Sequence, residues 1–372
     1  MGCKKIHILT FHCAYSVGAM LQAYALSHVL QQMGSDVEVI DYRPDLVRNR
    51  LIDQYASPHL WNRMKIRFLD WGKLAYRLVW YYPHRALRYR AVKGCTSSAF
   101  AEFMLRFLPL SEKTFYREEE LQEYADKSDI FITGSDQVWN PALSATPGAY
   151  LLDFVKSGIK TSYGASFGSC KLNQSYADKL AKALPGFRKI SVREENARIL
   201  LQETLGLPAV QVVDPVFLLP REQWLPFIHP VQGFENCIFV YRTERNSALN
   251  RDVDGFRNAD PKLKVVIFDG IQDGLLADIK IAIKGPAEFL SYLSACKFVC
   301  TNSFHGAAFS LIFQKKARIY SHSAYNDRIL SLMDLAGSRE NDGRFELSGN
   351  EYPNLSAARS ASLDFLQSIC RL

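Results

Sequence analysis

Short apolar runs alternate with helical patterns along most of this chain, and that alternation limits its fold more than any other feature. The clearest runs are residues 5–9, 37–40, 130–132 and 264–268. Strands separated by helices form βαβ units, whose strands pair in parallel. The chain has 372 residues, more than the roughly 250 to 300 that one hydrophobic core usually supports. We therefore expect two doubly wound α/β domains.

The boundary between the two domains is expected at a proline. The segment 212–220 predicts a strand followed by a proline break. We therefore predict an N-terminal domain of residues 1–215 and a C-terminal domain of residues 216–372. The N-terminal domain is expected to carry a basic, aromatic insertion at about 43–117.

One strand-like run, residues 298–302, leads directly into a helical pattern at 307–313. The corner between them joins a hydroxyl, an imidazole and the free N–H groups of a helix start, from Ser303, Phe304, His305 and Gly306. Such a corner can hold an anion and move a proton. The competing interpretation of His305 is a buried histidine bonded to the strand-end carbonyl. Ser303 and Asn302 can likewise cap the helix, which would itself help to place an anion.

Three further runs end at small or polar residues. The run 129–133 stops at a glycine turn beside a predicted pocket rim, which consists of Ser135, Asp136, Gln137 and Trp139. The run 161–163 ends at a second turn of glycine and serine, residues 164–168. After the run 189–192, Arg193 leaves a short strand with no local partner for its charge, as an anion-binding arginine would. All four junctions are strand ends, where doubly wound sheets bind their ligands.

Each of these side chains also has a structural interpretation. Asp136 can be a turn or helix-cap residue, and Trp139 is more often a core residue than a sugar-stacking surface. Arg193 can pair with Asp214, or with the two glutamates that follow it in the sequence. The sequence by itself leaves these alternatives open.

Taken together, the four junctions resemble the polysaccharide pyruvyltransferase family. The segments that carry the resemblance are GSDQVWN (134–140), SYGASFG (162–168), SVREENA (191–197), VVDPVFLL (212–219) and TNSFHGAAFSLIF (301–313). Residues 16–26 and 326–339 are also similar to the family's opening and closing helices. One departure lies before Gly18, where residues 14–17 lack the asparagine that the family usually carries.

The resemblance implies two Rossmann-like domains that face each other across a cleft, similar to the GT-B glycosyltransferases. It also implies transfer of a pyruvyl group from phosphoenolpyruvate to two hydroxyls of a hexose, of galactose type, in a bacterial capsular or exopolysaccharide precursor. The products of that reaction are a cyclic ketal and phosphate. Phosphoenolpyruvate acts as a co-substrate, and the implied reaction needs no cofactor and no metal ion.

The same resemblance suggests a role for each candidate residue. His305, which can carry a proton near neutral pH, is the expected acid/base residue, and Asp136 is expected to be a second catalytic residue. Arg193 and the helix start are expected to bind the donor. The helix-start residues are Asn302, Ser303, Phe304 and Gly306. The residues expected to bind a sugar or lipid-linked oligosaccharide acceptor are His12, Ser16, Gly18, Ser135, Gln137 and Trp139. For His12, a loop histidine bonded to backbone is the structural alternative.

Two other functions are compatible with this sequence. A GT-B glycosyltransferase that uses a nucleotide sugar would have the same fold. A melting shift with a nucleotide, but none with phosphoenolpyruvate, would favour it. A catalytically inactive member that only binds glycan is the third hypothesis, and the intact set of motifs stands against it.

The net charge of +7 is concentrated in one window. Between residues 43 and 93, twelve Lys and Arg stand against three Asp, a net charge of +9, so the rest of the chain is slightly acidic. Aromatic side chains typical of a membrane surface interleave with these charges, at Trp61, Trp71, Trp80, Tyr81 and Tyr82. The window is therefore either a surface that rests on anionic lipid or an ordinary solvated helical face. No nucleic-acid-binding module is recognisable in the sequence.

No run approaches the roughly 20 apolar residues of a membrane span, and the N-terminus lacks the apolar core of a signal peptide. We therefore expect a cytoplasmic protein that rests, at most, on the inner face of the membrane. Its eight cysteines show no paired metal spacing, so free and mostly buried thiols are expected.

Overall fold

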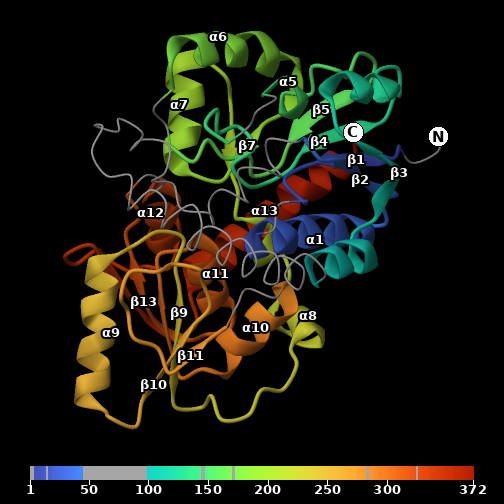
Figure 1. Ribbon diagram of the computed structural model, residues 1–372. Helices are drawn as coiled ribbons and strands as arrows, with labels where there is room; N and C mark the ends of the chain where they lie inside the picture. Colours follow the sequence, from blue (N-terminus) through green and yellow to red (C-terminus); the bar gives the residue numbers. More distant parts are fainter. Residues whose placement is uncertain are drawn as a thin grey trace, which may run out of the picture.

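The computed structural model describes residues 4–13, 16–44, 99–143, 147–169, 172–281, 285–323 and 326–372. Within these residues the chain forms two α/β domains, one above the other in Figure 1, each built on a six-stranded sheet. The expectation of two doubly wound domains is confirmed. Most of the basic, aromatic window at 43–93 lies outside the described residues.

All neighbouring strands of the N-terminal sheet pair in parallel, as the alternating pattern predicted. The strands are β1 (Ile6–Leu9), β2 (Val37–Tyr42), β3 (Leu110–Phe115), β4 (Ile130–Thr133), β5 (Ile159–Ser162) and β6 (Phe187–Lys189). Their spatial order is β3-β2-β1-β4-β5-β6. Strand β4 is buried along its whole length, which explains why its residues are apolar or β-branched. The strand order reverses between β1 and β4, and ligands of such sheets bind at this point.

The C-terminal sheet has the same strand order, although the sequence shows no internal repeat. Its strands are β9 (Cys237–Tyr241), β10 (Lys264–Ile267), β11 (Ile279–Lys280), β12 (Phe298–Thr301), β13 (Lys316–Tyr320) and β14 (Arg344–Ser348). Their order is β11-β10-β9-β12-β13-β14, and only the edge pair β13–β14 is antiparallel. The order reverses between β9 and β12, so the predicted corner after β12 lies at the switch point of this domain.

Helices connect the strands and pack on the sheets (Figure 1). In the N-terminal domain they are α1 (Val17–Gln32), α5 (Pro147–Tyr150), α6 (Gln174–Ala183) and α7 (Glu195–Leu205), with the 3₁₀ helices η2 (Glu118–Tyr124) and η3 (Leu184–Gly186). Residues 99–107 are also helical. A short parallel pair, β7 (Ser191–Val192) and β8 (Val210–Gln211), precedes the 3₁₀ helix η4 (Pro215–Phe217). The remaining elements are α8 (Arg221–Trp224), η5 (Leu225–Phe227), α9 (Ser247–Ala259), α10 (Pro286–Ala295), α11 (Phe304–Ile312), α12 (Asn326–Leu335) and α13 (Pro353–Cys370).

Helix α1 lies between the two domains and joins their cores. It is buried on nearly every side, and it packs against η4 and α10. Its Tyr24 ring meets Trp224 and Phe227 edge-on, with centroids 5.8 and 5.1 Å apart. A helix that is apolar all round is one enclosed by protein. One hydrophobic cluster consequently includes strand residues of both domains, such as Ile8 and Phe239.

The last helix, α13, returns to the N-terminal domain. The Ser362 hydroxyl accepts a hydrogen bond from the Val213 N–H at 3.0 Å, and Lys189 Nζ donates to Ser368 at 2.5 Å. The predicted division after residue 215 therefore separates the two sheets, but the final helix crosses back over it.

Two local predictions were wrong. Residues 212–213 are not a strand, because β8 ends at Gln211 and the chain then enters η4, which is capped by the Asp214 side chain. The predicted insertion at 43–117 includes β3, which pairs with β2 and forms the edge of the N-terminal sheet. A short polar edge strand has a weak apolar pattern, and the sequence therefore does not distinguish it from a loop.

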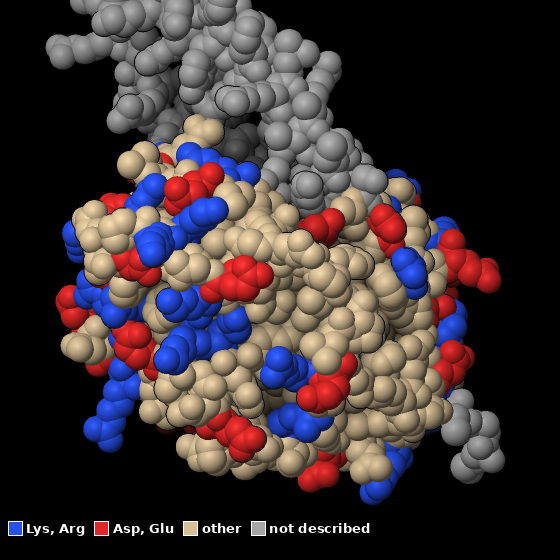
Figure 2. Space-filling view, turned by 90° about the horizontal axis from the view of Figure 1, so that it is seen from below, with Lys and Arg blue, Asp and Glu red and all other residues tan. Residues whose placement is uncertain are grey.

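The surface shown in Figure 2 carries basic and acidic side chains interspersed, without one large field of a single sign. Among the described helices, none has the length and apolar character required to cross a membrane. The five described cysteines have free thiols, as predicted, and Cys237, Cys296 and Cys300 are buried.

Candidate active site

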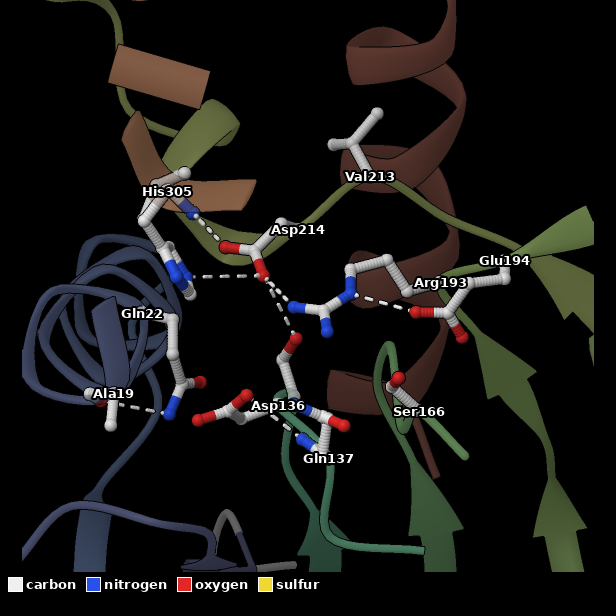
Figure 3. Close-up of polar contacts among 12 residues, drawn as sticks. Ala19, Gln22, Asp136, Gln137, Ser166, Arg193, Glu194, Val213, Asp214 and His305 are labelled. Atoms are coloured by element: carbon white, nitrogen blue, oxygen red, sulfur yellow. Dashed lines mark hydrogen bonds and ion pairs between the residues drawn. The ribbon is translucent and has the colours of Figure 1, made fainter. Parts of the chain in front are cut away.

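The four predicted junctions meet where the two domains join. Isolated bridges link Asp136 to Ala165 and Ala165 to Val192, so the turns after β4, β5 and β7 lie side by side. Figure 3 shows the start of α11, with His305, facing them across Asp214. This convergence follows from the topology, since the carboxyl ends of the strands at both switch points open toward the same place.

Asp214 lies at the centre of the site and is almost fully buried. One carboxylate oxygen accepts hydrogen bonds from an Arg193 guanidinium N–H and from the Ser135 hydroxyl, the latter at 3.2 Å. The same oxygen lies 3.8 Å from His305 Nε2. The other oxygen accepts from the Val216 N–H at 3.1 Å and so caps η4. A single carboxylate thus connects an arginine, a serine and a histidine from three separate segments.

The sequence predicted that Arg193 has no local partner for its charge. This prediction was wrong, because two carboxylates face the guanidinium. Its Nε donates to Glu194 at 3.2 Å, and its Nη1 donates to Asp214. Its guanidinium carbon lies 4.5 Å from the ring centroid of Phe304, a cation–π contact. Burial opposes the charge of Arg193, but Asp214 and Glu194 outweigh it and raise the pKa of Arg193 above its ordinary value. Nη2 is buried and has no hydrogen-bond partner among the described residues, so one donor is left for a ligand.

His305 lies in the first turn of α11 and is 8% exposed. Burial lowers the pKa of His305 below 6.5, and the carboxylates of Asp214 and Asp136 oppose this only in part. Burial therefore favours the neutral form of the imidazole. Its Nε2 has no hydrogen-bond partner within the described part of the chain, since 3.8 Å to Asp214 exceeds hydrogen-bonding distance. A neutral imidazole with an unused ring nitrogen can exchange a proton with a substrate.

Gly18 allows the first turn of α1 to approach the His305 ring. A Cβ atom at position 18 would lie 1.9 Å from His305 Nδ1, so any larger residue would displace the imidazole. Ser16 is the N-cap residue of α1, yet its side chain makes no capping hydrogen bond. The glycine turn predicted to bind the acceptor therefore contacts His305 directly.

Asp136 has a left-handed backbone, with φ of 76°. Residues other than glycine rarely adopt this conformation, and it is frequent at functional sites. One carboxylate oxygen accepts a hydrogen bond from the Gln137 N–H at 2.9 Å. In Figure 3 the Asp136 carboxylate lies on the same side of the site as the Gln22 amide. Asp136 also lies near enough to His305 for its charge to act on the imidazole.

Helix α11 begins at Phe304, before residue 307, where the sequence predicted its start. Its first turn lies close to the strand that precedes it. Ser303 caps it by accepting a hydrogen bond from the Gly306 N–H at 3.3 Å. A Cβ atom at Gly306 would lie 2.3 Å from Thr301 Oγ1, so glycine permits this close approach. The Phe304 ring contacts the guanidinium of Arg193, and its centroid also lies 5.8 Å from the guanidinium carbon of Arg328. The positive end of α11 and a second arginine therefore lie on the His305 side of the site.

Trp139 is a core residue, and its predicted role as a sugar-stacking surface was wrong. The side chain is fully buried, and its indole N–H donates to the Tyr150 carbonyl at 3.0 Å. The ring packs against Phe167, with centroids 5.5 Å apart. A large aromatic side chain gains more from burial than from exposure at a rim, provided that its N–H finds an acceptor.

His12 and Asn302 were also predicted to bind substrate, and both are fully buried. The His12 ring nitrogens are bonded to Thr10 O at 3.2 Å and to Asp41 at 2.9 Å. The Asn302 amide accepts from one backbone N–H and donates to one backbone carbonyl of residues 243–244, at 2.9 and 3.0 Å. Because their polar atoms are already bonded, these two side chains hold loops in place.

Ser135 and Gln137 support the turn after β4. Both side chains are buried. The Ser135 hydroxyl donates a hydrogen bond to Asp214, and the Asn140 side-chain N–H donates to the Gln137 side-chain oxygen at 2.8 Å. These contacts fix the position of Asp136 between them.

Gln22, Glu194 and Asp214 belong to the site but were not predicted as site residues. Gln22 Oε1 and Glu194 Oε2 are buried atoms with no hydrogen-bond partner among the residues described. Together with Arg193 Nη2 and His305 Nε2 they place four unsatisfied polar atoms in one region. Buried polar groups are nearly always satisfied, so such a concentration indicates a ligand site. Gln22 and Asp214 lie within segments that carried the family resemblance, but only the structure shows their burial and their missing partners.

Two surface cavities lie away from this site. One, of about 440 Å³, is lined by Glu118 and Lys179, and the other, of about 740 Å³, by Arg318 and Arg344. Two of the arginines that line the larger cavity, Arg318 and Arg344, are already paired with Asp252. We place the candidate active site at the domain junction, where four buried polar atoms have no partner among the described residues. Within the described residues, no group of three or more His, Cys, Asp or Glu side chains is arranged to hold a metal ion.

The chain is similar to solved structures that are distant from it in sequence. A protein from Listeria monocytogenes, assigned as a UDP-N-acetylglucosamine 2-epimerase, superposes with a TM-score of 0.50 at 10% identity, over 98% of this chain and 88% of that chain. The Escherichia coli heptosyltransferase WaaC with ADP gives a TM-score of 0.39 at 14% identity, over 98% of this chain and 99% of that one. No curated protein sequence matches. The first similarity and the sheet topology show a GT-B-type fold of two Rossmann-like domains.

A family comparison covers most of the chain. The sequence model of the polysaccharide pyruvyl transferases matches residues 17–323. This range begins at the first residue of α1 and includes the turns after β4 and β5, Arg193, Asp214 and the corner at His305. The chain is therefore a transferase that belongs to the polysaccharide pyruvyl transferase family.

Proposed function

We propose that this protein transfers a pyruvyl group from phosphoenolpyruvate to two hydroxyls of one hexose, of galactose type, in a bacterial capsular or exopolysaccharide precursor. The product is a cyclic pyruvate ketal, and the leaving group is phosphate. The proposed reaction uses phosphoenolpyruvate as co-substrate and requires neither a cofactor nor a metal ion. Membership of the family supports the class of reaction.

One observation carries the proposal, a pair of unused nitrogens beside one carboxylate. His305 Nε2 and Arg193 Nη2 are buried next to Asp214, and neither has a hydrogen-bond partner among the described residues. The first can exchange a proton and the second can donate to an anion. An enol phosphate that carries a carboxylate needs both groups.

Ketal formation requires a group that both accepts and gives a proton. The first sugar hydroxyl forms a bond to C2 while C3 gains a proton, and the second hydroxyl then forms a bond to C2 as the C2–O bond to phosphate breaks. Of the two hydroxyl protons lost, one is balanced by the new C3–H bond and the other leaves with phosphate. Burial lowers the pKa of His305 and so favours its neutral form. It is therefore ready to accept the proton of an attacking hydroxyl and to return it to C3.

Asp214 supports His305 in this scheme. When the imidazole takes a proton, positive charge forms 3.8 Å from the carboxylate, which attracts it strongly in a buried site. The hydrogen bonds from Arg193 and Ser135 hold the carboxylate in position. Asp214 is thus a positioning residue rather than one that contacts substrate.

The donor anion is bound from two sides in this scheme. Arg193 contributes one directed hydrogen bond rather than a net attraction, because Asp214 and Glu194 offset its charge. The first turn of α11 adds backbone N–H groups and a positive helix end. Arg328, near the Phe304 ring, adds a further positive charge. Ser303 and Phe304 therefore act through the helix start and the arginines that they contact.

The test is an incubation of the purified protein with phosphoenolpyruvate and a panel of α- and β-galactosides, glucosides and mannosides. Phosphate release and product mass are measured together. The expected product is heavier than the acceptor by one pyruvate less one water, with an equal amount of phosphate. Consumption of a nucleotide sugar, with no turnover of phosphoenolpyruvate, would overturn the proposal and favour a glycosyltransferase.

The proposal includes a lipid-linked acceptor and a cytoplasmic protein at the inner face of the membrane. The net charge of +9 at residues 43–93 and the interleaved Trp and Tyr residues support it. The protein should co-sediment with liposomes once anionic lipid is added, and less so at high salt. Sedimentation that stays flat across lipid compositions would contradict this part of the proposal.

A further inference from the structure

Gln22 presents a buried oxygen that nothing in the described structure satisfies. The residue lies in the second turn of α1 and is fully buried. Its Nε2 donates to Thr10 Oγ1 at 3.0 Å and to the Ala19 carbonyl at 2.9 Å, and it lies 3.5 Å from the Phe11 carbonyl. Oε1, in contrast, has no partner among the described residues. Such an oxygen costs about 1–3 kcal/mol of stability if it stays unsatisfied.

The orientation of this amide is fixed by its surroundings. A flipped amide would place Oε1 against the Ala19 carbonyl, where two acceptors would repel each other. Thr10 Oγ1 cannot donate to Gln22, because its own proton is donated to the Ser135 carbonyl at 2.7 Å. The nitrogen must therefore face these groups, and Oε1 must face away from them.

Figure 3 shows where Oε1 points. The Gln22 side chain projects from α1 into the site, with its amide beside Asp136 and below the contact between His305 and Asp214. The same Thr10 hydroxyl that holds Nε2 also bonds the turn after β4, so the amide is positioned relative to that turn. A free acceptor atom thus lies among the residues proposed for catalysis.

The chemistry of an amide oxygen selects between the two substrates. Gln22 Oε1 only accepts hydrogen bonds, and a phosphate or carboxylate oxygen of the donor would be repelled by it. A sugar hydroxyl satisfies it. Arg193 Nη2 is the opposite case, an unused donor suited to an anion. The two unsatisfied atoms therefore distinguish an acceptor side from a donor side within one site.

We propose that Gln22 Oε1 accepts a hydrogen bond from one hydroxyl of the acceptor hexose, and that Gln22 is thereby a residue that determines specificity for the acceptor. This inference rests on the proposed function for the identity of the acceptor, but not for the contact itself. A site with a buried acceptor atom discriminates strongly against an analogue that lacks the matching hydroxyl, because the atom is then left unpaired.

The experiment compares binding of methyl β-galactopyranoside and its four monodeoxy analogues, measured by calorimetry without turnover. The wild-type protein should bind one deoxy analogue about tenfold more weakly than the parent. Gln22→Met keeps the side-chain length but removes the amide, and it should bind the parent about tenfold more weakly as well. The same deoxy analogue should then show no further loss in this variant, while phosphoenolpyruvate binds as before.

Gln31→Met, the same exchange at an exposed position near the end of α1, is the matched control. It leaves Gln22 and its contacts in place, so galactoside binding should change by less than about threefold. A role of Gln22 in folding alone would weaken all five sugars equally in Gln22→Met. That result would overturn the inference, as would equal losses for sugar and phosphoenolpyruvate. Failure of the wild-type protein to bind any galactoside, glucoside or mannoside would also overturn it.

These outcomes are independent of the transfer reaction. If no ketal forms but the single-analogue pattern is found, the contact of Gln22 with a sugar hydroxyl stands and the proposed donor is wrong. If the ketal forms but Gln22→Met discriminates among the analogues as the wild-type protein does, the proposed function stands and the role of Gln22 fails.

Discussion

Among the buried histidines that have carboxylate neighbours, His7 and His305 differ in a way that separates structure from function. His7, in β1, is fully buried, with Nδ1 3.2 Å from Glu38 and Nε2 3.0 Å from Asp129. His305 has Asp214 nearby at 3.8 Å and an Nε2 without a partner among the described residues. Burial and a neighbouring carboxylate are common to both. The unused ring nitrogen is what distinguishes the second.

The region around His7 is saturated with contacts. Glu38 also accepts hydrogen bonds from the Tyr124 hydroxyl at 2.7 Å and from Lys5 at 2.9 Å. A network in which every polar atom is bonded stabilises the fold and has nothing left for a ligand. Around His305, several buried polar atoms have no hydrogen-bond partner among the described residues, as expected of a site that binds a substrate. Mutations should therefore affect stability in the first region and activity in the second.

The largest loss of activity is expected from Gly18→Ala. The new Cβ atom would lie 1.9 Å from His305 Nδ1 and push the imidazole away from Asp214. Pyruvyl transfer should fall by about 1,000-fold, since proton transfer by a positioned side chain contributes about 10² to 10⁴. The measurement is kcat with phosphoenolpyruvate and the best acceptor. Gly255→Ala, in a helix with no atom within 4 Å of the new methyl group, is the control and should keep full activity. Normal turnover by Gly18→Ala would show that His305 does not need its present position.

Exchange of each histidine for glutamine tests the comparison directly. His305→Gln should lower kcat by about 10²- to 10⁴-fold with little change in melting temperature, because glutamine cannot transfer a proton. His7→Gln should leave kcat within about twofold and lower the free energy of unfolding by about 2–4 kcal/mol, because it breaks a buried network that includes two carboxylates. Thermal unfolding and steady-state kinetics on both variants decide the matter. If the two substitutions had equal effects on kcat, unused polar atoms would be a poor guide to function in this fold.

Much of the fold and part of the site could be predicted from the sequence. The strands at 37–40 and 130–132 and the parallel pairing follow from local apolar runs, which the sequence displays directly. The edge strand at 110–115 was missed because polar residues at exposed positions hide its pattern.

The sequence predicted which residues form the site, but not which other residues they contact. The errors in the prediction concern those contacts. Arg193 was predicted to have no local partner, but it pairs with its neighbour Glu194 and with Asp214, which the fold brings close. Trp139 follows the rim turn in sequence, yet its ring is enclosed by other segments. Neither Gln22 nor its free oxygen can be recognised without tertiary contacts, because the satisfaction of a polar atom depends on residues distant in sequence.

The acid dependence of stability should reflect the saturated region. The hydrogen bond with His7 is the main cause that lowers the pKa of Glu38 to about 2, against a usual value of 4.5. A depressed carboxylate pKa stabilises the folded state above pH 4.5, and this stabilisation is lost as the pH falls toward 2. Glu38→Gln should therefore cost about 2 kcal/mol at pH 7 and almost nothing near pH 2.

Urea unfolding at several pH values between 7 and 2.5 measures the loss for Glu38→Gln. Exposed Glu346, whose only ion-pair partner among the described residues is Arg318, supplies the control Glu346→Gln, which should shift stability by less than about 0.5 kcal/mol at every pH. A pH-independent difference between Glu38→Gln and the wild-type protein would mean that charge at Glu38 is not what stabilises this region.

The smallest effect is expected from Trp139→Phe, which tests whether the rim turn contacts the acceptor. Phenylalanine keeps the aromatic packing against Phe167 but removes the N–H that donates to the Tyr150 carbonyl. Loss of one buried hydrogen bond, which leaves a carbonyl unsatisfied, should lower stability by about 1–2 kcal/mol. Because the ring is enclosed in the core, acceptor KM should stay within about twofold of the wild-type value. A rise of tenfold in acceptor KM, with unchanged stability, would restore Trp139 as a sugar-binding residue and would mean that the turn after β4 opens when substrate binds.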